Sequence, residues 1–445
     1  MSTPPNILYL NSHDTGRVIG PMGYRVRTPH LQRLADEGVL LRNCHCAAPT
    51  CSPSRAALIT GMVPHSCGMF GLGHRGWSLV DPSWTLPSHL GAHGYSTATW
   101  GMAANHCDRP GQFPDLASTA RGHGYDRFIE GPLEGLLTWL EGAPGGRPFF
   151  LNASWLLTHR HKTGFNTPPD PATYDPRYTL PPPPLADVPE VRADWAHFLA
   201  DISEWDRQIG LVLAALERSG RAGNTLIVVT TDHGPPFPGL KCHPTVHGTG
   251  VFCLLHGPGG FTGGLAVDHL LSQLDLFPTL CAVAGVPVPT RLHGVDLRPT
   301  LSGQPVRDYC TAEVTYHAAY EPWRAFRTAQ HLYVRRFGER RRPVVANCDA
   351  SPSRDHWLQA GWQFHDQADE ELYDSALDPQ ERQNLIGNPH YAGLGRDLRA
   401  RLEAWMVETA DPLLHGPVAL APGCRTTSVD AYDPNGLSFV GTAPR

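Results

Sequence analysis

Two short apolar segments, far apart in the chain, each stop at a pair of histidine and aspartate residues. Residues 6–10 (NILYL) lead into a His-Asp pair at 13–14, and residues 225–231 (TLIVVTT) lead into an Asp-His pair at 232–233. Continuous apolar runs of this length are typical of buried strands in a parallel sheet, and ligands bind beyond the carboxyl ends of such strands. We therefore expect an α/β fold in which both pairs lie at strand ends.

Segments with the apolar spacing of helices separate these two strands. They cover residues 29–37, 54–62, 84–93 and 195–219. This alternation favours a mostly parallel sheet sandwiched by helices. After about residue 301 the pattern changes to short strand-like pieces such as 331–335, followed by a helix around 389–408. We expect a main catalytic domain over residues 1–300 and a smaller α+β subdomain, an antiparallel sheet plus a helix, over residues 301–445 that completes the substrate pocket.

A proline-rich segment interrupts the main domain. Residues 167–189 hold nine prolines, and a segment of this composition is predicted to form no regular secondary structure. It is either a surface linker or a rim of the active-site cleft. The two readings stay open at this stage.

Charge and hydropathy exclude two classes of partner. The 445 residues carry a net charge of −6, with no long basic run, so nucleic acid is not an expected ligand. No apolar stretch approaches the roughly 18–20 residues that span a bilayer, so no membrane partner is expected. A small or oligomeric anionic substrate would have to be captured by local charge.

The amino terminus and the cysteines bear on the compartment. Residues 1–5 (MSTPP) form neither a charged nor an apolar leader, and we expect a cytoplasmic protein. Eleven cysteines without a CxxC pair fit free thiols better than a disulfide framework. Four of them are expected to be plain core or surface thiols: Cys44, Cys46, Cys67 and Cys107.

The segment Cys51-Ser52-Pro53-Ser54-Arg55 places one cysteine where a turn becomes a helix. Proline and serine favour helix initiation, so the first amides of the helix point back toward the cysteine. The arginine adds a fixed positive charge. We expect the thiol to be presented rather than buried, in a site for an anion.

Four further clusters supply acids, bases and metal ligands. They are residues 12–16, His106, residues 158–161, and residues 231–234 with Lys241. Together with Cys51 they predict an enzyme.

These motifs resemble those of the type I sulfatase family, whose C-x-P-S-R signature is matched in full at 51–55. Further matching stretches are GMFGL, THRH, TTDHGPPFPGLK and ELYDSALDPQERQNL, and the similarity looks closest to the heparan N-sulfatase (sulfamidase) branch. The resemblance implies an alkaline-phosphatase-like fold. It also implies that a formylglycine-generating enzyme oxidises Cys51 to formylglycine, whose hydrate attacks sulfur while a divalent cation neutralises the sulfate oxygens.

The resemblance implies a metal site at the two strand ends. Asp14 and Asp232 would be ligands, with His13 and His233 beside them as ligands or as hydrogen-bonding neighbours. Most sulfatases carry Asp-Asp and Asp-Asn at these places. The family implies Ca²⁺, whereas imidazole donors favour Mn²⁺ or Zn²⁺, and Mg²⁺ stays open.

The resemblance also implies roles for the remaining candidates. Arg55 would hold the hydrated aldehyde, His106 would act as the base that releases sulfate, His159 would donate a proton to the leaving group, and Lys241 would bind sulfate and the leaving atom. Glu313 and His317 are candidates for contacts to the sugar. Four of them have a plainer alternative: a salt bridge at the helix start for Arg55, a loop histidine for His106, a solvated polar loop for His159 and a surface lysine for Lys241. Met102 stands where the family carries a lysine.

The function that follows is hydrolysis of a sulfate ester or sulfamate on a sugar, with N-sulfoglucosamine of the heparan type favoured. Without an export signal, short imported fragments would be the substrates. One alternative is a phosphonate or phosphodiester hydrolase with the same fold. Another is a catalytically silent glycan-binding protein. The sequence predicts no oligomeric state.

Overall fold

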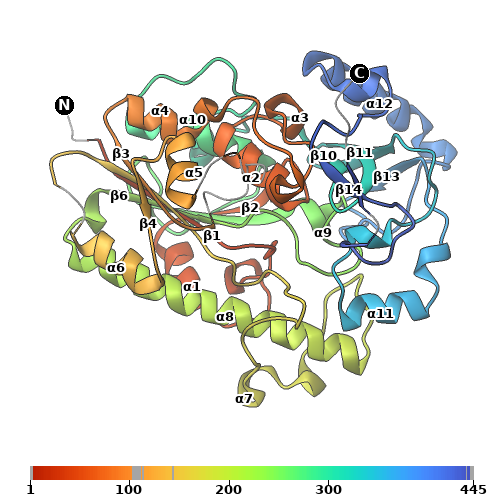
Figure 1. The fold of residues 1–445 in the computed structure, drawn as a ribbon, viewed down its shortest axis with the longest axis horizontal. Coiled ribbons are helices and arrows are strands. Elements are labelled where there is room, and N and C mark those ends of the chain that lie inside the picture. The colour runs from red at the N-terminus through yellow and green to blue at the C-terminus, as the bar shows by residue number, and fades with distance from the viewer. Residues whose placement is uncertain (1–3, 103–111, 113–114, 143–144, 437, 441–445) are drawn as a thin grey trace.

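A nine-stranded, mostly parallel sheet forms the centre of the larger lobe (Figure 1). The computed structural model describes residues 4–102, 112, 115–142, 145–436 and 438–440. The strand order is β4-β3-β5-β1-β6-β7-β2-β8, and β9 pairs with β2. Only β7 runs antiparallel to its neighbours. The strands are β1 (Asn6–Asn11), β2 (Val39–His45), β3 (Ser96–Gly101), β4 (Arg127–Ile129), β5 (Phe149–Ser154), β6 (Thr225–Thr230), β7 (Gly250–His256), β8 (Leu265–Val267) and β9 (Leu271–Ser272).

Helices cover both faces of this sheet. One layer consists of α1 (Pro29–Glu37), α6 (Leu133–Gly142) and α8 (Pro189–Arg218), which lie below the sheet in Figure 1. The other consists of α2 (Cys51–Thr60), α4 (Leu86–Ala92), α5 (Leu116–Gly122) and α10 (Leu276–Ala284). Short helices α3 (Pro64–Cys67), α7 (Pro171–Tyr174) and α9 (Val246–Thr249) lie in connections.

Strand β1 explains the continuous apolar run of the sequence. Because side chains alternate along a strand, Ile7 and Tyr9 pack in the core with α2 and α4, while Leu8 and Leu10 pack in the core with α1 and α8. All four are buried. β1 pairs in parallel with β5 on one side and β6 on the other. The predicted α/β sandwich is therefore confirmed.

A second, antiparallel sheet lies in the carboxy-terminal part of the chain, in the order β10-β11-β12-β13. Its strands are β10 (Cys310–Tyr316), β11 (Tyr320–Arg327), β12 (His331–Arg336) and β13 (Glu370–Asp374). α12 (Ala392–Glu408) packs on it through a shared core that also takes Ala57 of α2 and Val63. α11 (Pro352–Gln359) and the pair β14 (Arg425–Thr427) and β15 (Ser438–Val440) complete this lobe. The predicted α+β character is confirmed; the domain boundary at residue 300 stays a prediction.

Three local expectations need correction. α2 begins at Cys51 rather than near residue 54, and α8 begins at Pro189, because proline fits the first turn of a helix. The proline-rich segment is not devoid of helix: α7 and a 3₁₀ turn over Pro176–Tyr178 form there, each starting with a proline behind an aspartate cap. Prolines therefore start short helices here rather than abolish them.

No helix in the described part of the chain combines the length and the apolar character needed to cross a bilayer.

Candidate active site

The two strand ends bring the predicted acidic pairs together. Asn11 at the end of β1 pairs with Thr230 at the end of β6. Just beyond, the backbone N–H of Asp14 donates to Asp232 Oδ1 at 2.8 Å. Asp14 adopts φ 52°, a left-handed conformation that is unusual for a residue other than glycine. The backbone turn at Asp14 thus links the two loops directly.

We call His13, Asp14, Asp232 and His233 the strand-end cluster; each is at most 1% exposed. His13 Nδ1 lies 2.7 Å from Asp14 Oδ1 and 3.4 Å from Asp232 Oδ2. His233 Nε2 lies 3.0 Å from the same Asp14 oxygen. With the thiol of Cys51, one ligand atom from each residue lies within 4.8 Å of all the others.

The donor set fits a divalent cation. His233 Nδ1 lies 2.9 Å from the carbonyl oxygen of Gly234, which can only accept, so the proton resides on Nδ1 and the Nε2 lone pair faces the carboxylates when the ring is neutral. Two carboxylates and two imidazoles are the mixed oxygen and nitrogen set that suits Mn²⁺ or Zn²⁺ better than Ca²⁺. These four residues could hold a metal.

The charges of the cluster shift its pKa values in opposite directions. Burial lowers the pKa of His13, but Asp232 and Asp14 outweigh burial and raise it to about 10. The same carboxylates raise the pKa of His233 against burial. Burial raises the pKa of Asp14, yet Lys241 and the two histidines hold it well below its ordinary value. The two carboxylates thus stabilise positive charge beside them. A cation bound there would displace the protons of the two imidazoles.

Cys51 is the first residue of α2 and points into this cluster. Its Sγ lies 3.4 Å from His233 Nε2 and 4.0 Å from Asp14 Oδ1. The prediction of a presented thiol was wrong: all ten residues of α2 are buried. Burial raises the pKa of the thiol, but Lys241 and His13 lower it well below its ordinary value. The site therefore favours a negative charge at residue 51.

Arg55, one turn along α2, connects the three central strand ends. Its Nε donates to Asp232 Oδ2 at 3.0 Å, its Nη1 to Ser154 Oγ at 2.6 Å, and its Nη2 to the carbonyl oxygen of Ser12 at 3.2 Å. The contact of Arg55 with Ser154, at the end of β5, was not foreseen from the sequence.

Lys241 closes the other side of the cluster. Its Nζ lies 2.8 Å from Asp14 Oδ2 and 3.2 Å from Asp349 Oδ2, and the side chain is buried. The next residue, Cys242, has φ 67°. Asp349 belongs to the carboxy-terminal part of the chain, and no sequence motif singled it out.

His159 stands beside the cluster. Its ring packs edge-on against His13, with ring centroids 4.6 Å apart. Its Nδ1 is buried and has no hydrogen-bond partner among the described residues. The adjacent Arg160 anchors the loop through Nη1 and Nη2, which donate to the two oxygens of Asp194 at 2.6 and 3.0 Å.

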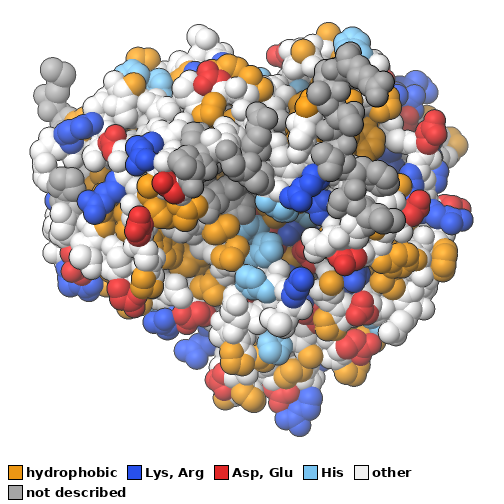
Figure 2. Space-filling view, in the orientation of Figure 1, with side chains coloured by type: hydrophobic (Ala, Val, Ile, Leu, Met, Phe, Trp, Pro, Cys, Tyr) orange, Lys and Arg blue, Asp and Glu red, His pale blue; other side chains and the backbone are white. Residues whose placement is uncertain are grey.

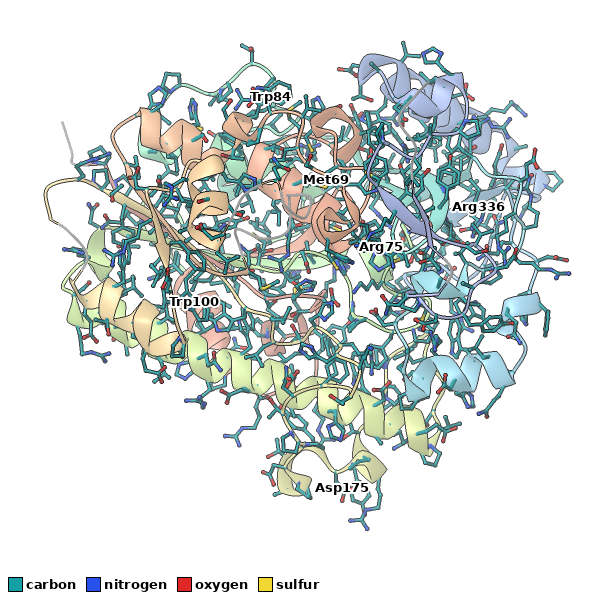
Figure 3. All side chains as sticks on the ribbon, in the orientation of Figure 1. Met69, Arg75, Trp84, Trp100, Asp175 and Arg336 are labelled. Atoms are coloured by element: carbon teal, nitrogen blue, oxygen red, sulfur yellow. The ribbon has the colours of Figure 1, made fainter. Side chains whose placement is uncertain are left out.

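His317 is buried close enough to the site for the charge of Lys241 to act on its ring, whereas Glu313 does not join the strand-end cluster. Burial, then the charge of Lys241, lowers the pKa of His317 to about 4, so its ring is neutral at pH 7. Arg75, labelled in Figure 3, donates through Nη1 to the carbonyl oxygen of Ala318 and fixes the adjacent turn. Figure 2 shows histidines gathered near the centre of this face with Lys or Arg side chains beside them.

Glu313 belongs to a second buried group, which we call the interface cluster: His65, Glu313, Arg324 and Asp411. Glu313 Oε1 accepts from the backbone N–H of His65 at 2.8 Å, and Oε2 lies 2.5 Å from His65 Nδ1. Since both carboxylate oxygens are engaged, a contact to the sugar is not supported for this residue.

His106 lies outside the described residues, and its role stays a prediction. Met102, which replaces the lysine expected from the resemblance, lies just before that gap and is partly exposed.

Comparison with known proteins decides the family. The family model described as Sulfatase matches residues 5–286. This chain belongs to the sulfatase family. The match includes the signature at 51–55, both strand-end pairs and Lys241. The predicted enzyme class, a hydrolase of sulfuric esters, is confirmed.

Relatives of this sulfatase match nearly its whole length. The N-sulphoglucosamine sulphohydrolase of Homo sapiens is 28% identical over 484 residues, covering 95% of this chain and 95% of that protein. The Delta 4,5-hexuronate-2-O-sulfatase of Bacteroides thetaiotaomicron is 27% identical over 490 residues, covering 95% and 92%. A structure solved in complex with its substrate D-glucosamine-2-N,6-O-disulfate is similar in fold, with a TM-score of 0.66, 18% identity and coverage of 93% and 99%.

Proposed function

We propose that this sulfatase removes the N-sulfate group of N-sulfoglucosamine, or a sulfate ester of a related sugar, from short fragments, with residue 51 in the formylglycine form. One observation carries the proposal. Cys51, the first residue of the sulfatase signature, begins α2 and lies 3.4 Å from His233 Nε2, inside a cluster of two carboxylates and two imidazoles. A formylglycine-generating enzyme would supply the aldehyde.

The choice of sugar rests on the relatives. The human relative is named as an N-sulphoglucosamine sulphohydrolase and matches 95% of this chain. Its identity of 28% supports a sulfated sugar as substrate class. The assignment of the N-sulfate, in preference to an O-sulfate, is the finer part of the proposal.

The strand-end cluster would hold one divalent cation through Asp14, Asp232, His13 and His233. A cation there supplies positive charge for the sulfate oxygens, and the aldehyde supplies, as its hydrate, an oxygen nucleophile. The chain's own part is orientation. Because Arg55 is tied to Asp232 and to the end of β5, its guanidinium stays fixed beside residue 51.

Lys241 and His159 would act on the substrate. The Lys241 ammonium is buried, so its attraction for a sulfate oxygen is weakly screened by water. His159 has a buried ring nitrogen without a described partner, and from that nitrogen it would give a proton to the leaving atom. His106 is proposed as the base for sulfate release on the resemblance alone.

Release of inorganic sulfate tests the proposal. The matured enzyme would be offered N-sulfoglucosamine, glucosamine 6-O-sulfate and an aryl phosphodiester, with Cys51→Ala as control. We expect sulfate from the sugars, fastest from N-sulfoglucosamine, and no reaction of the phosphodiester. Cleavage of the phosphodiester alone would contradict the proposal. So would thermal stabilisation by the sugars without any product, which is the behaviour of a silent glycan-binding protein.

Metal dependence has a readout apart from activity. After treatment with a chelator, addition of Mn²⁺, Zn²⁺, Ca²⁺ or Mg²⁺ should raise the melting temperature, because an ion that binds only the folded state stabilises it. We expect the nitrogen donors to give Mn²⁺ or Zn²⁺ the larger shift at equal concentration. Equal shifts in a variant lacking both Asp14 and Asp232 carboxylates would contradict this site.

A further inference from the structure

Asp349 reaches the candidate active site from the far end of the chain. It lies outside residues 5–286, the range of the family model. Its Oδ2 is 3.2 Å from Lys241 Nζ, and 24% of its side chain is exposed. Oδ2 itself is buried, so the exposed area lies on the remainder of the side chain. Asp349 therefore contacts Lys241 through a buried oxygen, while part of its side chain stays exposed.

The loop that carries Asp349 is held on both sides. Before it, Asn347 Oδ1 accepts from the backbone N–H of Ala319 at 2.8 Å, next to His317. After it, Ser353 Oγ donates to Asp194 Oδ2 at 2.6 Å. Figure 1 shows α11, which begins at Pro352, beside the end of α8 that carries Asp194. The same Asp194 anchors Arg160 beside His159, so Asp349 is fixed relative to three proposed substrate-contacting groups.

The contact between Asp349 and Lys241 is an ion pair without an aligned hydrogen bond. The distance of 3.2 Å satisfies an ion pair, yet Oδ2 has no hydrogen-bond partner among the described residues. Lys241 already has a closer partner in Asp14 Oδ2 at 2.8 Å. Asp349 thus keeps acceptor capacity beside the group proposed to contact the leaving atom.

A sulfamate and a sulfate ester differ in what they offer at that atom. The sulfamate nitrogen carries an N–H, whereas the ester oxygen carries only lone pairs. A carboxylate accepts from N–H in a charge-assisted hydrogen bond and repels an ester oxygen. In the overall reaction R–NH–SO₃⁻ + H₂O → R–NH₃⁺ + SO₄²⁻, the S–N bond breaks, its electron pair goes to nitrogen, and an S–O bond forms. The nitrogen becomes cationic, which a carboxylate stabilises.

We propose that Asp349 is the specificity-determining residue that selects nitrogen over oxygen as the atom bonded to sulfur. This inference rests on the proposed function. It assigns the selection between a nitrogen and an oxygen leaving atom to the carboxylate of Asp349. Asp349 would accept the sulfamate N–H in the bound substrate and pair with the ammonium as it forms.

A matched pair of substrates tests this role. Steady-state kinetics would compare N-sulfoglucosamine with glucose 2-O-sulfate, which differ at the scissile atom. We expect Asp349→Asn to lower kcat/KM for the sulfamate about 10- to 100-fold, the range of one hydrogen bond to a charged group. For the ester, kcat/KM should stay within about threefold of wild type or rise. Asp349→Ser provides a second variant of the same type.

Asp355→Asn is the control, because Asp355 is an exposed carboxylate on α11 that contacts only the neighbouring Arg354 in the described structure. It should leave both substrates unchanged. An equal fall on both substrates in Asp349→Asn would overturn the proposal and assign the residue to holding Lys241. Unchanged kinetics would overturn it as well. If wild type cleaves the ester and never the sulfamate, the proposed N-sulfate function and this inference both fail. If wild type cleaves the sulfamate and Asp349→Asn leaves the ratio of the two kcat/KM values unchanged, only the inference fails.

Discussion

The strand-end cluster and the interface cluster are both buried and both bring histidine together with two carboxylates, but their carboxylates are paired in different ways. In the interface cluster, Arg324 donates from Nε and Nη2 to the two oxygens of Asp411, at 2.5 and 3.0 Å. Glu313 is engaged by His65 on both oxygens. In the strand-end cluster, two histidines and a lysine instead crowd one carboxylate, that of Asp14.

The backbone of the two clusters differs in degree: only the strand-end cluster has a left-handed residue among its own members. The strand-end cluster and its surroundings include non-glycine residues in the left-handed region: Asp14 at φ 52°, Thr158 at φ 75° and Cys242 at φ 67°. The interface cluster takes its residues from α3, β10, β11 and the turn after α12; none of the four is itself in this region, although Ala410, next to Asp411, has φ 55°. Strained backbone is characteristic of functional sites. The ion pairs of the interface cluster, by contrast, hold α3 to the carboxy-terminal sheet.

The largest effect should follow loss of Cys51. Cys51→Ala should lower sulfate release by more than about 10⁴-fold, because it removes the precursor of the nucleophile. The melting temperature should change little, since alanine fits the helix start. Sulfate release and calorimetry on the same samples provide the measurement. Sulfate release within tenfold of wild type would mean that residue 51 does not provide the nucleophile.

A smaller loss is expected for Asp14→Asn. The change removes a proposed metal ligand that also contacts Lys241 at 2.8 Å, and sulfate release should fall about 10²- to 10³-fold. Metal content, measured by elemental analysis after gel filtration, should fall in parallel. Full metal content in the variant would contradict the assignment of Asp14 as a ligand.

The matched change in the interface cluster should act on stability instead. Asp411→Asn leaves the fully buried Arg324 without its carboxylate, which should lower the free energy of unfolding by about 3–5 kcal/mol. Urea titration measures the loss. At temperatures where the variant is folded, kcat should stay within about threefold of wild type. A fall in kcat as large as that of Asp14→Asn would show that the interface cluster also serves activity.

Glu313→Gln should have a milder effect. It leaves His65 Nδ1 with a neutral partner and should lower the free energy of unfolding by about 1–3 kcal/mol. KM for a sulfated sugar should not change, because both oxygens of Glu313 contact His65. A raised KM with unchanged stability would restore Glu313 as a substrate contact.

The smallest effect concerns acid stability. Burial alone raises the pKa of Asp411, but its hydrogen bonds and charge interaction with Arg324 lower it below the ordinary value. The ionised carboxylate therefore stabilises the fold above about pH 4, the pKa of an unfolded aspartate, and this stability is lost as the pH falls through the lower folded pKa. Between about pH 5 and 3, urea titrations should give a shallower decline for Asp411→Asn than for wild type. An identical slope would contradict this assignment.

Sequence reasoning succeeded where a feature is local. The apolar runs before residues 13–14 and 232–233 predicted both strands, because strands buried on both faces need continuous apolar residues and open into polar loops. The signature at 51–55 predicted a helix start in this segment, and α2 begins at Cys51, three residues before the expected range. The burial of Cys51 was missed, because it depends on the neighbours that pack around α2 in three dimensions.

Long-range contacts lay beyond local patterns. Asp349 meets Lys241 from a loop that carries no motif, and only the fold brings the two together. Glu313 and His317 are four residues apart, a spacing that would place both on one face of a regular strand. β10 has an irregularity between Val314 and Tyr316 and ends at Tyr316, so His317 lies beyond the regular strand and the two residues meet different surroundings. No alternation rule predicts such a bulge.

We propose that residue 51 acts as an aldehyde beside the strand-end cluster. Mass spectrometry of the tryptic peptide Asn43–Arg55, from protein made in its native host and treated with a hydrazide, tests it most directly. We expect a hydrazone at residue 51 in active protein. An unmodified thiol at this position in protein that releases sulfate would contradict it.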